Sequence, residues 1–222
     1  MTRNVKISLA LIAVVVLGAG ALALATDSSD DAAAPSGTTA AAAGGGPQAI
    51  RPDSHRLSTA RDDRVTLVEF LDFECESCRA LYPVLEEMRA EYEGRVTFAI
   101  RYFPIASHTN AQLAAQVVEA AAQQGKLEQM YRTMFETQAE WGESQESREA
   151  TFVGFARRLG LDMDRFRSDL NDPRTVARVA KDQEEGVALG VQGTPTLFLN
   201  GELLTLESVE QLKAEIDAAL AQ

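Results

Sequence analysis

The sequence predicts an α/β domain in which an all-helical insertion separates a βαβ half from a C-terminal half made of a β-hairpin and a helix. Two apolar runs, VTLVEFLD at 65–72 and RVTFAIRYF at 95–103, flank a helical stretch, and that order implies a pair of parallel strands. Residues 109–190 then place apolar side chains at helical spacing. The segment 194–204, TPTLFLNGELL, gives two short strands around Asn200-Gly201, a dipeptide that favours hairpin turns.

The βαβ half can be outlined from its local signals. The run at 65–72 is mostly apolar, which is typical of a largely buried strand. The helix that follows it ends near Gly94 and contains Pro83, which we expect to kink it. A possible edge strand precedes this unit near 54–58.

The insertion is predicted to contain only helices. A plain crossover between parallel strands needs about a dozen residues, so 109–190 is long enough to be a helical subdomain. Thr109 or Asn110 can cap its first helix, and Asp172-Pro173 suits the start of its last one. We expect its core to contain Leu127, Met130, Tyr131, Met134, Phe135, Trp141, Phe152, Phe155, Ala156, Leu159, Val176, Val179 and Ala180. A final amphipathic helix carries Val209, Leu212, Ile216 and Leu220 on one face.

The first 53 residues are predicted to lie outside the domain, which we place at 54–222. Residues 7–25 contain no charge, and their number nearly matches the roughly 20 that span a bilayer as a helix. Two basic residues precede them and three aspartates follow, so residues 1–6 are expected in the cytoplasm and the rest outside. A cleaved signal peptide is the alternative, because Ala23-Leu24-Ala25 resembles a small-x-small cleavage site. Residues 26–53 are rich in small and polar residues, as in a flexible linker.

The charge of the chain argues against one class of partner. Its formal net charge is −12, and an acidic domain repels the phosphate backbone of nucleic acids. We therefore expect no nucleic-acid partner and attribute the charge to solubility.

Cys75 and Cys78 are the chain's only cysteines, and their spacing limits what they can do. A structural zinc site needs four ligands, whereas the two histidines, His55 and His108, are far apart in sequence and unpaired. A structural disulfide across two residues would restrict almost no unfolded chain, since stabilisation grows with loop length. The remaining interpretation is that the two cysteines are a redox pair at the junction of a strand and a helix, which suits an exported domain.

This interpretation assigns a role to each thiol. The N-terminus of the helix presents unpaired N–H groups and a positive dipole end to Cys75, which would stabilise its thiolate. Cys75 is therefore expected to be the exposed nucleophile, and Cys78, one turn along and more buried, to resolve the mixed disulfide. Glu74 and Glu76 are expected to be exposed charges that tune the thiolate electrostatically.

The order of these motifs resembles the DsbA-type thiol-disulfide oxidoreductases, which have a thioredoxin fold with a helical insertion. The resemblance covers about residues 54–222 and includes Phe70, Phe73, Pro83 and FPIASHTNAQLAAQ at 103–116. It implies that Pro195, in Gly193-Thr194-Pro195, is a cis-proline facing the cysteine pair, with Thr194 presenting its backbone to an extended substrate. It also implies that Glu69 is a buried acid beneath the site, and we expect it to relay protons to Cys78. Glu76-Ser77 departs from the Pro-His of strongly oxidising members, which leaves the direction of electron flow open.

The resulting hypothesis is an exported, membrane-tethered thiol-disulfide oxidoreductase that forms disulfides in unfolded secreted proteins. It needs no cofactor beyond the redox-active disulfide of Cys75 and Cys78. The resemblance implies a quinone-linked membrane protein of the DsbB or VKOR type as its re-oxidant. A reductase or isomerase of the same fold is the first alternative. A copper-binding metallochaperone or binding module, with Cys75, Cys78 and His108 as ligands, is the second; otherwise His108 is expected to support the entry to the insertion.

Overall fold

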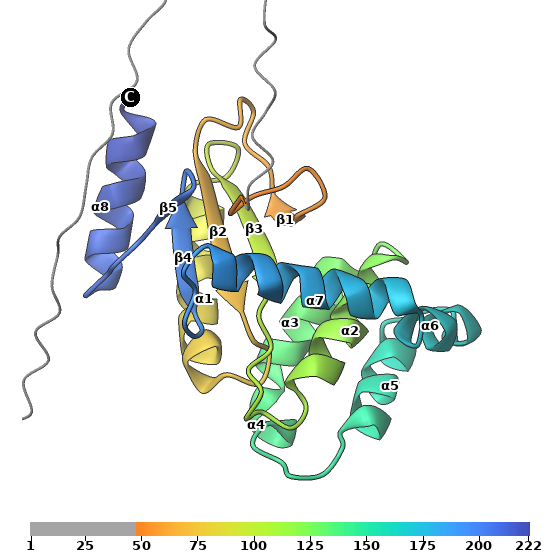
Figure 1. Cartoon of the computed structure of the whole chain (residues 1–222). Coiled ribbons are helices and arrows are strands. Elements are labelled where there is room, and N and C mark those ends of the chain that lie inside the picture. The colour runs from red at the N-terminus through yellow and green to blue at the C-terminus, as the bar shows by residue number, and fades with distance from the viewer. Residues whose placement is uncertain (1–47) are drawn as a thin grey trace, which may run out of the picture. The chain divides into compact units, whose positions relative to one another are not determined.

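The computed structural model describes residues 48–222, which contain a five-stranded sheet with helices on both of its faces (Figure 1). The strand order is β1-β3-β2-β4-β5. The strands are β1 (His55–Ser58), β2 (Thr66–Leu71), β3 (Thr97–Tyr102), β4 (Thr196–Leu199) and β5 (Glu202–Leu203). β2 and β3 pair in parallel, and the other three pairings are antiparallel. The predicted βαβ unit, the edge strand and the C-terminal hairpin are therefore confirmed.

An all-helical insertion separates β3 from β4, as the sequence predicts. The helices are α1 (Glu76–Glu91), α2 (Ala111–Ala122), α3 (Leu127–Glu136), α4 (Gln138–Trp141), α5 (Glu149–Arg158), α6 (Met163–Leu170), α7 (Pro173–Ala188) and α8 (Val209–Leu220), of which α2 to α7 form the insertion. Asp172 caps α7 by accepting a hydrogen bond from the Arg174 N–H, with Pro173 at the first turn. Figure 1 shows the helices α2 to α6 gathered beyond one end of the sheet, with α7 lying along it.

Alternation along β2 divides its side chains between the two faces of the sheet. Leu67 packs in a cluster with residues of α1 and α8, whereas Val68 and Phe70 belong to a cluster on the opposite face. α7 covers that second face at very short range. A Cβ added to Gly186 would lie 2.9 Å from ring atoms of both Phe70 and Phe103, so this helical position requires the absence of a side chain.

The core of the insertion extends to the cysteine pair. One cluster of buried residues contains Cys78 and Leu71 together with Met130, Met134 and Trp141. The core predicted for the insertion is confirmed, except that Leu127, Leu159 and Ala180 are only partly buried. Val176 is also an exception, because it is exposed. Because the insertion shares its core with the start of α1, it forms one wall of the region around the cysteines.

The predicted end of the linker at residue 53 is wrong, because the segment 48–53 already packs on the domain. Ala49 and Arg51 are buried. The Arg51 guanidinium lies 2.6 Å from an Asp182 carboxylate oxygen, and Arg101 bonds the same oxygen at 2.6 Å. Asp182 is fully buried, and a buried charge must be paired. No sequence pattern marks this segment, since its attachment depends on one arginine and a distant helix.

The predicted membrane segment at 7–25 and its flanks at 1–6 and 26–47 lie outside the described residues. Within 48–222, no helix combines the length and apolar character needed to cross a membrane.

Replacing Arg51 by alanine should destabilise the domain. Asp182 would keep Arg101 but lose a second charged donor in a buried setting, which should lower the free energy of unfolding by about 1–3 kcal/mol. Arg64→Ala is the matched control, because its ion pair with Asp62 is exposed and should contribute less than about 1 kcal/mol. Urea unfolding of both variants measures the difference, and an equal effect would show that the 48–53 segment is not anchored by Arg51.

Candidate active site

The two cysteines lie at the junction between β2 and α1. β2 ends at Leu71 and α1 begins at Glu76, with Cys75 as its N-cap residue in an extended conformation. Both cysteines are thiols in this structure. Cys75 is less exposed than the sequence led us to expect, at 7% of its surface, but it remains more accessible than Cys78 at 0%. An incoming sulfur atom therefore reaches Cys75 first.

The surroundings of Cys75 stabilise its thiolate. The pKa of Cys75 is lowered to about 5, chiefly by a hydrogen bond from the Cys78 side chain. The Thr194 side chain and the backbone N–H groups of Cys78 and Ser77 lower it further, and partial burial opposes them. These N–H groups belong to the first turn of α1 and have no partner within the helix. Cys75 is consequently an ionised nucleophile at neutral pH.

Cys78 has the opposite electrostatic environment. Its pKa is raised well above that of a free thiol, first by burial, then by the hydrogen bond to Cys75 and by the charge of Glu69. Cys78 therefore holds its proton when Cys75 is ionised. This asymmetry is the division between a nucleophilic and a resolving thiol that thiol-disulfide exchange requires.

Glu69 is a buried carboxyl group on the side of β2 that faces α1. One of its oxygens, Oε1, is buried with no hydrogen-bond partner. Burial, and next the charge of Cys75, raise the pKa of Glu69 to about 8. A cavity of about 10 Å³ adjoins Glu69 and is also lined by Arg89 and Tyr131, which is about the room that one water molecule needs. Glu69 is thus a protonated acid near Cys78 at neutral pH.

The loop before β4 faces the cysteines. The Thr194–Pro195 peptide bond is cis. The Cys75 sulfur lies 3.3 Å from the Thr194 carbonyl oxygen, to which it donates a hydrogen bond when it is protonated. Cys75 and Thr194 are 119 residues apart in the sequence, and the antiparallel pairing of β2 with β4 brings them together.

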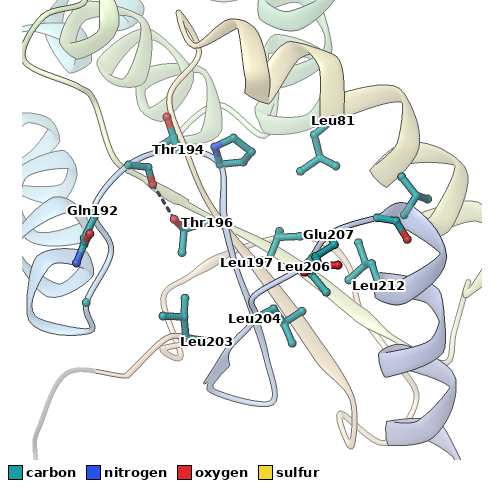
Figure 2. A pocket seen from close by; sticks show the side chains of 15 residues that line it. Leu81, Gln192, Thr194, Thr196, Leu197, Leu203, Leu204, Leu206, Glu207 and Leu212 are labelled. Carbon is teal, nitrogen blue, oxygen red and sulfur yellow. Dashed lines mark hydrogen bonds between the residues drawn. The ribbon is translucent and has the colours of Figure 1, made fainter.

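An apolar groove begins at this loop and runs toward α8 (Figure 2). Its volume is about 780 Å³. Figure 2 shows Thr194 and Thr196 at one end, with Leu203, Leu204, Leu206 and Leu212 along its length and Leu81 of α1 opposite them. Leu203 and Val209 are large apolar residues left exposed here. The groove therefore offers apolar surface next to the Thr194 loop, which the reactive sulfur contacts.

Glu74 and Glu76 do not share the exposed position predicted for both. Glu76 is exposed, as expected, at the first residue of α1. Glu74 is 3% exposed, and its carboxylate accepts a hydrogen bond from the Asn110 N–H at 2.6 Å. The reason is that the insertion folds over this loop, so Glu74 caps backbone at the start of α2 and does not face solvent.

Asp72 and Gln138 lie near the cysteines but were not assigned to the active site from the sequence, which named His108 only as a copper ligand or as support for the entry to the insertion. The buried Asp72 carboxylate accepts hydrogen bonds from the backbone of Glu74 and from the His108 ring. Gln138 of α4 donates to the carbonyl oxygens of Phe73 and Cys75. Asp72 could have been recognised as a candidate from the sequence, because it is an acidic residue directly after a predicted buried strand. Nothing local marks Gln138, because its partners lie more than 60 residues away.

The structure bears on the copper alternative as well. Among residues 48–222, no group of three or more histidine, cysteine, aspartate or glutamate side chains is arranged to hold a metal ion. The site proposed from Cys75, Cys78 and His108 is therefore not assembled here.

Comparison with known families agrees with this geometry. Residues 60–218 match a family model described as Thioredoxin. The chain belongs to the thioredoxin family, and its paired thiols form the site of a thiol-disulfide oxidoreductase.

Solved structures share the fold over most of the chain. A thioredoxin-like oxidoreductase from Silicibacter pomeroyi is 26% identical, with a TM-score of 0.66 over 79% of this chain and 97% of that one. Oxidised BdbD from Bacillus subtilis is 20% identical, with a TM-score of 0.70 over 80% and 98%. The thiol-disulfide exchange protein α-DsbA2 from Wolbachia pipientis is 21% identical, with a TM-score of 0.62 over 74% and 86%. The thioredoxin-like fold with a helical insertion is thereby confirmed.

Curated relatives include proteins named as Na(+)/H(+) antiporters. NhaA 3 of Salinispora tropica is 37% identical over 153 residues, which is 68% of this chain and 22% of that protein. NhaA of Herminiimonas arsenicoxydans is 32% identical over 155 residues, or 70% and 24%. The chain thus spans about a quarter of the length of these relatives. Matches of this length cannot fit within residues 1–47, so they lie largely in the described domain.

Replacing Glu69 by glutamine should stabilise the reduced protein in a pH-dependent way. A carboxyl group with a raised pKa contributes its stability below the unfolded pKa of about 4.3 and loses it as pH rises toward about 8. The unfolding free energy of Glu69→Gln should therefore match that of the parent near pH 4 and exceed it by several kcal/mol, at most about 1.4 per pH unit, near pH 8. Glu93→Gln, at an exposed position, is the control. A pH-independent difference would contradict the buried-acid assignment.

Proposed function

We propose that this protein is an extracytoplasmic thiol oxidase that introduces disulfides into reduced exported proteins. The observation that carries the proposal is the ionised Cys75, with a pKa of about 5, beside a buried and protonated Cys78. A stabilised thiolate stabilises the reduced form of the couple, and a stable reduced form makes the disulfide a strong oxidant. This favours oxidation over reduction of substrates, although Glu76-Ser77 replaces the Pro-His dipeptide of strongly oxidising members.

The first step transfers the substrate to Cys75. In the oxidised protein, a substrate thiolate attacks the Cys75 sulfur, a new S–S bond forms, and Cys78 leaves with the bonding electron pair. Cys78 has a high pKa and is a poor leaving group as a thiolate. Glu69, protonated below about pH 8, would give Cys78 a proton in this step and take it back on reoxidation.

The second step releases the oxidised substrate. Another substrate thiolate attacks the substrate sulfur of the mixed disulfide, and Cys75 leaves as a thiolate. Departure of Cys75 is favourable because α1 and Cys78 already stabilise its negative charge. The substrate has lost two electrons, and the protein holds them as the reduced cysteine pair. No cofactor enters beyond the Cys75 and Cys78 disulfide.

The groove beside Thr194 suits unfolded substrates. An extended chain can pair its backbone with Thr194, as a strand adds to a sheet, and place apolar side chains in the groove. Unfolded proteins expose such side chains, and the leucines of Figure 2 would bind them with little sequence preference. A folded protein would present few of them.

A membrane location completes the proposal. Residues 7–25 would anchor the domain outside the cytoplasm, or act as a signal peptide, and a DsbB or VKOR-type membrane protein would reoxidise the cysteines. The antiporter relatives support a membrane setting, because part of each resembles this domain. Antiport itself is not proposed, since the shared part is about a quarter of those proteins.

Trapping of covalent adducts should depend on which cysteine remains. Cells that express Cys78→Ser should accumulate mixed disulfides between Cys75 and exported proteins, because the resolving thiol is absent. Cys75→Ser should trap nothing, since Cys78 is buried. Non-reducing gels followed by identification of the adducts measure this. Equal trapping by both variants would remove the assignment of nucleophile and resolver.

The reduction potential of the couple decides between oxidase and reductase. We expect equilibration with glutathione to give a value between about −180 and −120 mV, the range of disulfide-forming proteins. A value near about −270 mV, typical of thioredoxin, would overturn the proposed direction and support a reductase.

A further inference from the structure

His108 lines a cavity together with the nucleophile, and Glu69 does not line that cavity. His108 sits in the loop between β3 and α2, and the cavity that it lines is also lined by Cys75, Glu76 and Ser77. The volume of this cavity is about 390 Å³, enough for a cysteine side chain and its neighbours. The His108 side chain is 31% exposed, so it can be reached by a substrate and is still held by the protein.

A buried carboxylate fixes the orientation of the His108 ring. The Nδ1–H donates to Asp72 Oδ2 at 2.6 Å, and the Asp72 side chain is fully buried. Asp72 also accepts from the Ile105 N–H, while its carbonyl oxygen accepts from the Cys75 N–H. His108 and Cys75 are therefore both tied to one rigid residue. With its proton on Nδ1, the ring has a free electron pair on Nε2.

We propose that His108 is the general base that deprotonates the substrate thiol before it attacks. The proposal rests on the oxidase function above. The substrate S–H gives its proton to His108 Nε2, and the resulting thiolate attacks sulfur while the leaving sulfur takes the electron pair. The proton leaves His108 to solvent after the step. Glu69 and His108 act on different sulfur atoms. Glu69 supplies a proton to the leaving Cys78 sulfur inside the protein, whereas His108 removes a proton from the attacking substrate thiol at the surface.

The charges around His108 suit this role. The titratable groups that face its cavity are Glu74, Glu76, Glu143 and Cys75, in addition to Asp72 beneath the ring. No lysine or arginine of the described chain lines that cavity. The Asp72 carboxylate orients the ring through Nδ1, as a carboxylate does for the histidine of a catalytic triad. In the reduced protein, Cys75 needs no such base, because it is already ionised.

The experiment compares two thiols that differ in ionisation. A thiol that carries its proton at pH 7, such as 2-mercaptoethanol, needs a base; an aromatic thiol that is already ionised at pH 7 does not. We expect His108→Gln to slow reduction of the Cys75 and Cys78 disulfide by 2-mercaptoethanol about 100-fold, the usual contribution of a general base. Its rate with the aromatic thiol should equal that of the parent. Added imidazole should restore part of the lost rate.

His55→Gln is the matched control. His55 is also bonded to a carboxylate, that of Glu119, but it does not line the cavity of Cys75, so both thiols should react at the parental rate. Equal slowing of both thiols by His108→Gln would show a structural role and overturn the proposal, as would no slowing of either. Failure of the unaltered protein to react with both thiols would instead contradict the oxidase function itself.

Discussion

The hydrogen bonds that stabilise the Cys75 thiolate at the start of α1 are the constraint on which the rest of the site depends. β2 delivers Cys75 to the N-cap position, where Cys78, Ser77 and Thr194 lower its pKa to about 5. One sulfur is thereby charged and accessible and the other neutral and buried. A pair of equivalent thiols could exchange electrons, but it would have no preferred point of attack and no stable reduced form.

Glu69 and Asp72, two of the three buried carboxyl groups near the cysteines, differ in their hydrogen bonding, and this difference separates their roles. Glu69 has an oxygen without any partner, and burial raises its pKa to about 8, so it can carry a proton. Asp72 accepts hydrogen bonds from two backbone N–H groups and from His108, so it is suited to hold other groups in place. They are three positions apart around the end of β2, which shows how strongly local donors decide what a carboxyl group does.

The helical insertion does more than enlarge the core. The Gln138 side chain donates to the carbonyl oxygens of Phe73 and Cys75. The Asn110 backbone N–H donates to the Glu74 carboxylate, and its side-chain amide donates to the carbonyl oxygens of Ser144 and Glu146. The bonds to Phe73, Cys75 and Glu74 satisfy groups that burial would otherwise leave unpaired. The loop that carries the cysteines is therefore fixed from the insertion as much as from the sheet, and the groove beside Thr194 remains open.

The sequence by itself determined the α/β class, the parallel pair, the helical insertion, the hairpin at Asn200-Gly201 and the pairing of Cys75 with Cys78. Each of these features follows from the local spacing of apolar residues, from turn residues or from a contiguous motif. Only the tertiary structure decided that Glu74 is buried, that the domain begins before residue 54, and that Asp72, His108 and Gln138 surround the cysteines. Those outcomes depend on side chains tens of residues apart meeting in space. Burial and partner choice follow from the packing of whole elements, which no short pattern encodes.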